Sequence, residues 1–166
     1  IESYHAVATH PQILPYTEDA DSQYDVWGDN ISRTITALGV PSFHLKDVTD
    51  QDVVDTMLGV SAMVARPNHA KVPDGMTARE YIGQLNSETF SENHDRELES
   101  FATNAERMDS ILYSIFPNFA PWAGFHPNIT YRFRPNGDDH RSALMEVIVI
   151  KQLATGAPRP KDVPVR

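Results

Sequence analysis

The sequence predicts an α+β domain built around an antiparallel sheet. Stretches with helical spacing of apolar residues lie between stretches with β-like alternation. The last two β-like stretches, residues 129–134 and 142–152, are separated by a turn of Pro, Asn, Gly and Asp residues. These residue types suit tight turns, so the two stretches are predicted to pair as an antiparallel hairpin. With 166 residues, the chain is long enough for one domain with its own hydrophobic core.

The first elements are an acidic segment and a strand. Residues 16–22 are polar and acidic and are predicted to form an exposed loop. Asp19 and Asp21 in this loop are better explained as solvated side chains than as metal ligands. Residues 30–38 are predicted to form a strand, because apolar and polar positions alternate there and a Gly and a Pro follow.

Three helices follow in the prediction. One begins near Thr49, where acidic residues occupy the first turn. A second begins at Thr77, because Thr77 and Glu80 have the spacing of a capping box. A third and longer helix is predicted from about residue 93 to residue 110, with apolar residues such as Phe101 facing the sheet.

The second half of the chain is predicted to be rich in β structure. Residues 111–116 form a strand that a proline-containing segment stops, and the hairpin follows. Glu146 lies inside an otherwise apolar run and needs a partner of opposite charge. Arg132 or Arg134 on the paired strand is expected to supply it, as a structural ion pair rather than as part of a catalytic site.

Composition excludes several classes of partner and cofactor. The net charge of −9 at pH 7, spread over short acidic clusters, disfavours nucleic acid and anionic membranes as partners. No run approaches the roughly 20 apolar residues that cross a bilayer, so a soluble protein is expected. The chain has no cysteine, which rules out disulfides, thiolate zinc sites and cysteine-ligated iron–sulfur clusters within it. The lack of cysteine also fits a cytoplasmic location.

Two histidines near the N-terminus are the strongest candidates for a metal site. His5 and His10 are five residues apart, which places them about 140° apart around an ideal helix. Pro11 disfavours the α conformation at His10, so the helix is expected to end there and let His10 turn toward a metal that His5 faces. The alternative is a partly buried aromatic helix end that binds no metal. The spacing by itself does not decide between the two.

Three stretches, in this order, resemble the catalytic domain of the α subunit of Rieske non-haem iron oxygenases, the aromatic-ring-hydroxylating dioxygenase family. They are residues 2–11 with the two histidines, residues 114–118 with the Phe-Pro-Asn segment, and residues 131–139 with the strand after them. The resemblance spans almost the whole chain. It implies a helix-grip fold, in which a curved antiparallel sheet folds around a long helix with the iron between them.

The resemblance also implies roles for particular residues. His5 and His10 would bind a mononuclear Fe(II) and, with one carboxylate, form a facial triad that leaves positions open for O2 and substrate. Glu2 would bridge to the Rieske cluster of a neighbouring subunit and carry electrons to the iron. The residues expected to line the substrate pocket are Ser3, Ala6, Phe116 and Asn118.

The implied reaction is O2-dependent hydroxylation or demethylation of an aromatic or related apolar substrate. Electrons from NAD(P)H would arrive through a reductase, with or without a ferredoxin, and then through a 2Fe–2S Rieske cluster. Head-to-tail homotrimers, with or without β subunits, are the expected assembly.

Two parts of the family pattern have no counterpart here, so residues 1–166 are interpreted as part of a catalytic domain. The acidic third ligand would follow Arg166, and the Rieske domain would precede Ile1. Two neutral imidazoles alone would hold Fe(II) weakly, so this chain is expected to be metal-poor and inactive. The alternatives are a helix-grip module that binds a hydrophobic molecule without catalysis and, with weaker support, a hydrolytic zinc site.

Overall fold

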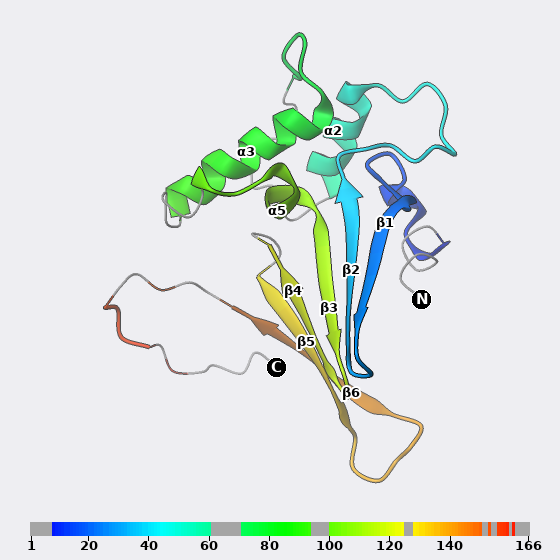
Figure 1. Cartoon of the computed structure of the whole chain (residues 1–166), viewed down its shortest axis with the longest axis vertical. Helices are drawn as coiled ribbons and strands as arrows, with labels where there is room; N and C mark the ends of the chain where they lie inside the picture. The colour runs from blue at the N-terminus through cyan, green and yellow to red at the C-terminus, as the bar shows by residue number, and fades with distance from the viewer. Residues whose placement is uncertain are drawn as a thin grey trace.

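The computed structural model describes residues 8–60, 71–93, 100–124, 128–150, 153, 156–159 and 161, with the backbone alone at 18–21, 60 and 89–93. In these residues, six strands form one antiparallel sheet in which each strand pairs with the next strand along the chain. The helices lie together at one end of this sheet (Figure 1). The predicted α+β class with an antiparallel sheet is confirmed.

In the described part of the chain, three α-helices lie between the second and third strands, and a short 3-10 helix precedes the first strand. The elements are η2 (Pro11–Ile13), β1 (Thr17–Trp27), β2 (Ile31–Leu38), α2 (Asp50–Val60), α3 (Ala78–Asn93), α5 (Asn104–Met108), β3 (Ser110–Ile115), β4 (Phe119–Ala123), β5 (Ile129–Pro135) and β6 (Ala143–Val149).

Four of the six strands match the sequence prediction closely. The predicted strand at 30–38 is β2, and the strand predicted at 111–116 is β3. The predicted hairpin is formed by β5 and β6, which pair antiparallel with Arg132 opposite Glu146. Glu146 accepts hydrogen bonds from Arg132 Nε and, at 2.7 Å, from Arg134 Nη2, so both arginines supply the expected ion pair.

The predicted loop at 16–22 is wrong, because most of it belongs to strand β1. Polar residues are stabilised there by cross-strand bonds rather than by intrinsic β propensity. Thr17 Oγ1 donates to the Ala37 carbonyl at 3.1 Å, and the Ser22 and Thr36 hydroxyls lie 2.9 Å apart. The pairing shifts register between Thr17 and Ser22, which identifies an irregularity inside the acidic stretch. The side chains of Asp19 and Asp21 lie outside the described residues.

Helices α2 and α3 begin where the sequence predicted. Thr49 and Asp52 bond reciprocally at the start of α2, through Thr49 N to Asp52 Oδ2 at 2.9 Å and Asp52 N to Thr49 Oγ1 at 3.2 Å. Thr77 and Glu80 form the same arrangement at α3, with Thr77 N bonded to Glu80 Oε2 at 2.9 Å. These bonds satisfy backbone donors that a helix start otherwise leaves open.

The single helix predicted from 93 to 110 is wrong in the described residues. A separate short helix, α5, begins after Thr103, whose side chain and that of Glu106 form a capping box. Phe101, predicted to face the sheet, is 78% exposed. Ser110, predicted as the helix end, is the first residue of β3. Residues 94–99 lie outside the described part of the chain.

The hydrophobic core lies at the helical end of the sheet. Its buried apolar side chains come mainly from α2 and α3, while β2 contributes Leu38 and α5 contributes Met108. A buried ion pair joins the layers: Arg79 of α3 donates to both carboxylate oxygens of Asp109, and Asp109 accepts the Leu38 amide at 3.2 Å. Arg79 also donates to the Leu38 carbonyl, so helix α3 is fixed to the end of β2.

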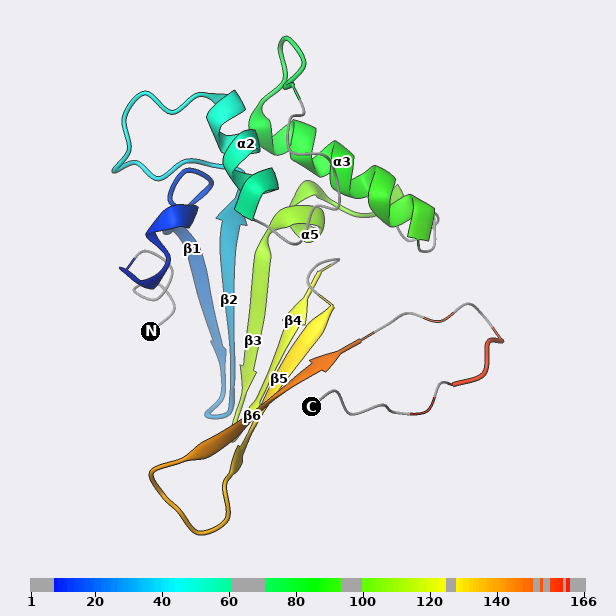
Figure 2. The ribbon, with the colours of Figure 1, turned by 180° about the vertical axis from the view of Figure 1, so that it is seen from behind.

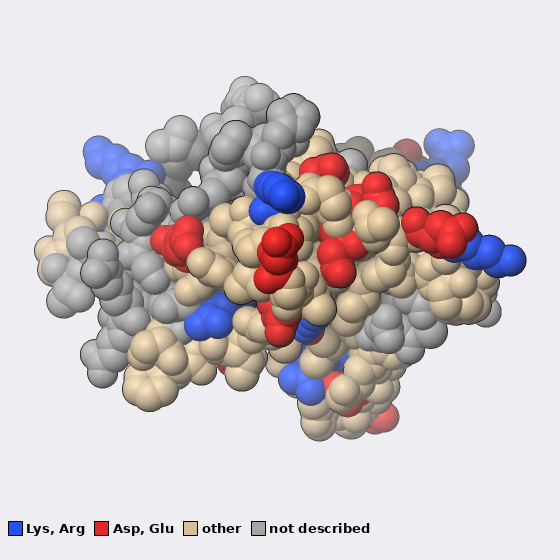
Figure 3. Space-filling view, turned by 90° about the horizontal axis from the view of Figure 1, so that it is seen from above, with Lys and Arg blue, Asp and Glu red and all other residues tan. Residues whose placement is uncertain are grey.

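The opposite end of the sheet extends beyond the helices and carries exposed apolar side chains. Figure 2 shows β1 to β6 continuing past α2, α3 and α5 to the turns at the far end. The helical end differs in character, since acidic side chains are numerous on the face seen in Figure 3, with a few Lys and Arg between them. Large exposed apolar residues on the extended part of the sheet include Val26, Trp27, Phe116, Phe133, Met145, Val147 and Val149.

Candidate functional site

His10 is the one predicted metal ligand that the described residues contain. A helical turn at residues 8–9 stops before His10, whose φ of −123° and ψ of 59° lie outside the α region. Pro11 then opens the short helix η2. The predicted end of the helix near His10 is therefore confirmed, and its physical reason is the restriction that Pro11 places on the preceding residue. Glu2, Ser3, His5 and Ala6 lie outside the described residues.

A contact between Gln12 and the His10 ring bears on which ring nitrogen can act as a ligand. Gln12 Nε2 lies 3.4 Å from His10 Nδ1, and the ring is half-buried. With the Gln12 amide in this orientation, Nδ1 accepts and Nε2 carries the proton. If the Gln12 amide is turned over, Gln12 Oε1 accepts a hydrogen bond from His10 Nδ1–H. His10 Nε2 then presents its lone pair to a metal. Gln12 is thus placed to select the metal-binding tautomer of His10.

The described residues contain no complete metal site. In that part of the chain, no three His, Asp or Glu side chains come together in a way that could hold an ion. His10 supplies one imidazole, a ligand type that suits Fe(II), but one imidazole does not fix a metal. No chemical step through iron follows from these residues, and the ligand roles of His5 and His10 stay predictions.

Phe116 and Asn118, the predicted pocket residues, line a hollow at the far end of the sheet. The hollow has a volume of about 440 Å³, within the size range of small-molecule sites. It lies between the β1–β2 turn, the β3–β4 turn and β5. We call it the turn hollow; its lining residues are Val26, Asp29, Asn30, Ile31, Ser32, Ser114, Ile115, Phe116, Pro117, Asn118, Phe119, Ala120 and Phe133.

Backbone hydrogen bonds hold the three parts of the turn hollow together. The Phe116 amide donates to the Asn30 carbonyl at 2.8 Å, which joins the β3–β4 turn to the β1–β2 turn. The Phe133 amide donates to the Asn118 carbonyl at 2.9 Å, which joins the same turn to β5. Gly28, with φ of 58°, allows the tight β1–β2 turn, because a left-handed conformation is unfavourable for other residues. The hollow therefore has a fixed backbone frame.

Three phenylalanines and one carboxylate give the turn hollow its chemistry. Phe116, Phe119 and Phe133 are 71%, 37% and 42% exposed, so their rings are accessible to a ligand. Asp29 is the one charged residue in its lining. Sequence reasoning missed Asp29, because residues 23–29 were assigned to no element and the β1–β2 turn was not recognised. Phe119 and Phe133 were missed because they were assigned to the segment that stops a strand and to a hairpin strand, without a role in a pocket.

A second hollow adjoins the first on the β5–β6 side. It has a volume of about 660 Å³ and shares Pro117, Asn118 and Phe133 with the turn hollow. Its own lining includes side chains of both signs of charge, with Arg134, Asp138 and Asp139, and also His140. The turn hollow therefore differs from the second hollow in having fewer charged residues in its lining.

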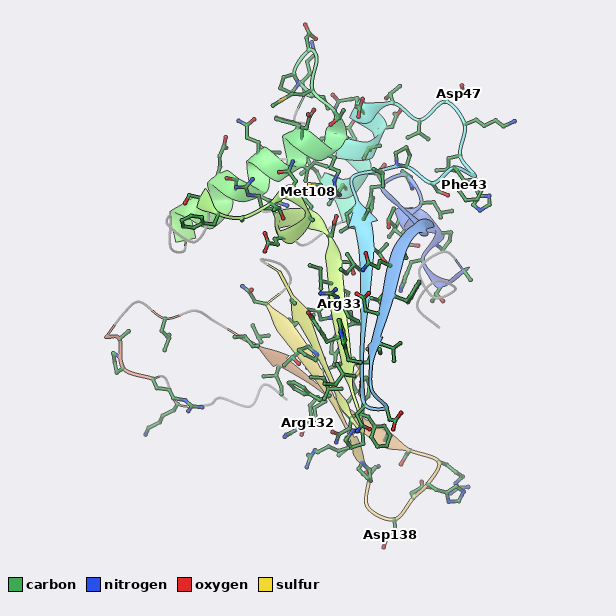
Figure 4. The ribbon with its side chains drawn as sticks, in the orientation of Figure 1. Arg33, Phe43, Asp47, Met108, Arg132 and Asp138 are labelled. Carbon is green, nitrogen blue, oxygen red and sulfur yellow. The ribbon has the colours of Figure 1, made fainter. Side chains whose placement is uncertain are left out.

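Charged pairs beside the turn hollow are structural. On the neighbouring strands, Arg33 donates to Asp25 at 2.7 Å and lies 5.0 Å from the Trp27 ring centre. Hydrogen bonds from Gln23 and then Arg33 lower the pKa of the Asp25 carboxyl. On the other side, the hydrogen bond from Arg132 and the charges of Arg132 and Arg134 lower the pKa of Glu146. These groups neutralise one another across strands. Figure 4 shows where Arg33 and Arg132 lie on the sheet.

His10 and the turn hollow lie at opposite ends of strand β2. Leu14, four residues after His10, accepts the Ser42 amide beyond the end of β2, whereas Asn30 at the hollow precedes the start of β2. A strand of this length spans about 23 Å at ~3.3 Å per residue. The structure therefore brings Phe116 and Asn118 together but places them far from His10.

Comparisons with protein families, curated proteins and solved structures found no match to this chain. None of the helices in the described part of the chain has the length and apolar character needed to span a bilayer.

Proposed function

We propose that this chain is part of the catalytic domain of the α subunit of a Rieske non-haem iron oxygenase. The observation that carries the proposal is the histidine motif, in which Pro11 ends the helix at His10 and Gln12 can set the tautomer of its ring. The Phe-Pro-Asn segment and the Arg-containing hairpin follow it in the family order, on an antiparallel sheet. A helix-grip arrangement is the finer fold that this proposal requires.

Each predicted residue then has one task. His5 and His10 would hold Fe(II), which supplies O2 activation when bound. Glu2 would carry electrons from the Rieske cluster of a neighbouring subunit, as the family resemblance implies. Ser3 and Ala6 would contact an aromatic substrate beside the iron, whereas Phe116 and Asn118 lie at the other end of β2 and do not share that pocket. The reductase, a ferredoxin and a trimeric assembly remain part of the same proposal.

The test is oxygen incorporation. The chain is joined to the Rieske domain and to the acidic ligand that the proposal requires, and it is given Fe(II), a reductase and NADH under ¹⁸O2, together with a panel of aromatic hydrocarbons and aryl methyl ethers. Incorporation of ¹⁸O into product should disappear in His5→Ala and His10→Ala and persist in His44→Ala, because His44 is exposed in a loop outside the motif. Product without ¹⁸O, or the same yield from His5→Ala and His10→Ala, would contradict the proposal.

A second function is favoured by the separation of the turn hollow from His10. A single small molecule does not reach across about 23 Å of strand, so the hollow can hold a ligand that the metal site never contacts. A rigid apolar hollow with a few polar groups is the usual form of a small-molecule site. We propose that the turn hollow binds a hydrophobic small molecule without metal.

Metal-independent binding tests this second function. Addition of para-tert-butylphenol should shift the amide signals of Phe116, Phe119 and Phe133 in an NMR titration, equally with and without EDTA. His10→Ala should leave the titration unchanged. Shifts that vanish with EDTA would instead tie the hollow to the metal site.

A further inference from the structure

The charge of the turn hollow restricts the kind of ligand it can accept. Asp29 is exposed at its rim and, within the described residues, no Lys or Arg is paired with it. Asp25, two strand positions before the same turn, differs because Arg33 neutralises it. An unpaired carboxylate beside apolar rings favours a positive charge and disfavours a negative one.

The three phenylalanine rings that line the same hollow as Asp29 also favour a positively charged ligand. Aromatic faces carry negative electrostatic potential and attract ammonium groups, above all alkylated ones that are weakly hydrated. Phe116, Phe119 and Phe133 come from the β3–β4 turn, β4 and β5, so they border the hollow from different elements. Apolar contact from Val26 and Ile31 would cover the alkyl part of such a ligand.

Two arginines beside the hollow are already paired with a carboxylate other than Asp29. Arg132 stands opposite Phe119 in the sheet register, but its guanidinium is bonded to Glu146. Arg134 lines the adjoining hollow and is bonded to the other oxygen of Glu146, at 2.7 Å. The overall charge of −9 also raises the local concentration of cations around the molecule.

We infer that the turn hollow is a site for an apolar ligand that bears an alkylated ammonium group, with Asp29 as counter-ion and the phenylalanine rings as the apolar walls. This inference rests on the proposed ligand-binding role of the hollow and does not depend on a metal. It names the ligand class that the hollow selects.

A pair of isosteric probes isolates the charge. Para-hydroxyphenyl-trimethylammonium and para-tert-butylphenol differ by a positively charged nitrogen in place of a carbon, and para-hydroxybenzoate supplies a negative charge. Binding is followed by NMR shifts of the hollow amides. The ammonium probe should bind about fivefold more tightly than the neutral one, as expected for an exposed cation–π contact helped by one carboxylate, and the benzoate should bind most weakly.

Matched variants assign the preference to residues. Asp29→Asn and Phe116→Leu should each reduce the preference for the ammonium probe while the neutral probe still binds. Asp74→Asn, which removes an exposed carboxylate at the helical end, and Phe43→Leu, which removes an exposed ring there, should leave the preference unchanged. A folded spectrum outside the hollow shows that each variant is intact.

The possible results separate this inference from the function it rests on. Equal binding of the ammonium and neutral probes, or a preference that survives Asp29→Asn, would overturn the inference and leave the hollow as a neutral ligand site. Tighter binding of the benzoate would overturn it as well. No shift of hollow amides with any probe would overturn both the inference and the proposed ligand-binding role.

Discussion

The ion pair between Arg79 and Asp109 should be the polar interaction on which the stability of the helical end depends most. The Asp109 side chain is 6% exposed, and Arg79 reaches its two oxygens at 2.6 and 3.0 Å. Arg79→Met would leave a buried carboxylate that still accepts a hydrogen bond from the Leu38 amide, at 3.2 Å. Removing one partner of a buried pair costs about 3–5 kcal/mol, because the other charge stays desolvated.

The expected loss is somewhat smaller than that. The Arg79 side chain is 26% exposed, so water can reach part of the space that it vacates. We therefore expect Arg79→Met to lower the free energy of unfolding by about 2–4 kcal/mol. Asp109→Asn keeps an acceptor for the Leu38 amide and should cost less, about 1–2 kcal/mol.

Urea unfolding followed by circular dichroism measures both variants and the double variant. The double variant should be more stable than the sum of the single losses predicts, since both remove the same interaction. Arg141→Met, which breaks an exposed pair with Asp139 at 3.2 Å, is the control and should stay within about 0.5 kcal/mol of the parent. A loss for Arg79→Met no larger than that of the control would refute the reasoning.

Two further predictions concern backbone space and pH. Gly39→Ala should destabilise the protein more than Gly75→Ala in urea unfolding, although both glycines have φ near 80°. A Cβ at Gly39 would lie 2.8 Å from Met108 Cε and 3.2 Å from Arg79 Cα, whereas a Cβ at Gly75 would have no atom within 4 Å. Equal losses would argue against the close packing at Gly39. Glu146→Gln should destabilise the folded protein at neutral pH and lose that effect in acid. The hydrogen bond from Arg132 holds the pKa of folded Glu146 below its ordinary value of 4.5. The stabilisation from the Glu146 carboxylate is therefore present above pH 4.5 and is lost as the pH falls through the folded pKa. A difference between Glu146→Gln and the parent that stays constant from neutral to strongly acidic pH would contradict the assigned ion pair, and Asp74→Asn serves as its exposed control.

The hairpin and the two helix starts could be predicted because local chemistry determines them. The turn residues between β5 and β6, and the Thr-x-x-Glu spacing at Thr77, act within a few residues of the structure that they form. The Glu146 ion pair was predictable for a related reason. A charge inside an apolar strand has its nearest neighbours on the paired strand, and the hairpin register determines which ones.

Strand β1 and the break before α5 could not be read from average preferences. The acidic residues of β1 resemble a loop, and they form a strand because β2 supplies hydrogen bonds and the cation of Arg33. The periodicity of residues 93–110 suggested one helix, although Thr103 and Glu106 already carried the signal for a new helix start. A capping signal inside a helical pattern should therefore be weighed against the periodicity.

The candidate site shows the same limit at longer range. The end of the helix at His10 followed from Pro11 alone. The turn hollow could not be predicted from local residues. It forms because residues near 30 and residues near 116 meet across the sheet, where the Phe116 amide donates to the Asn30 carbonyl. Asp29 acquires a possible function from that meeting and has no distinctive local pattern.

Titration with Co²⁺, an air-stable substitute for Fe(II), tests the central claim most directly, because weak binding in fast exchange is visible in NMR. Of the seven histidines, His5 and His10 should lose imidazole signal together at the lowest Co²⁺ concentration, and His44 and His140 should not. His5→Ala should abolish the effect at His10. Uniform broadening of all histidines, or an effect at His10 that survives His5→Ala, would contradict the account of a shared metal site.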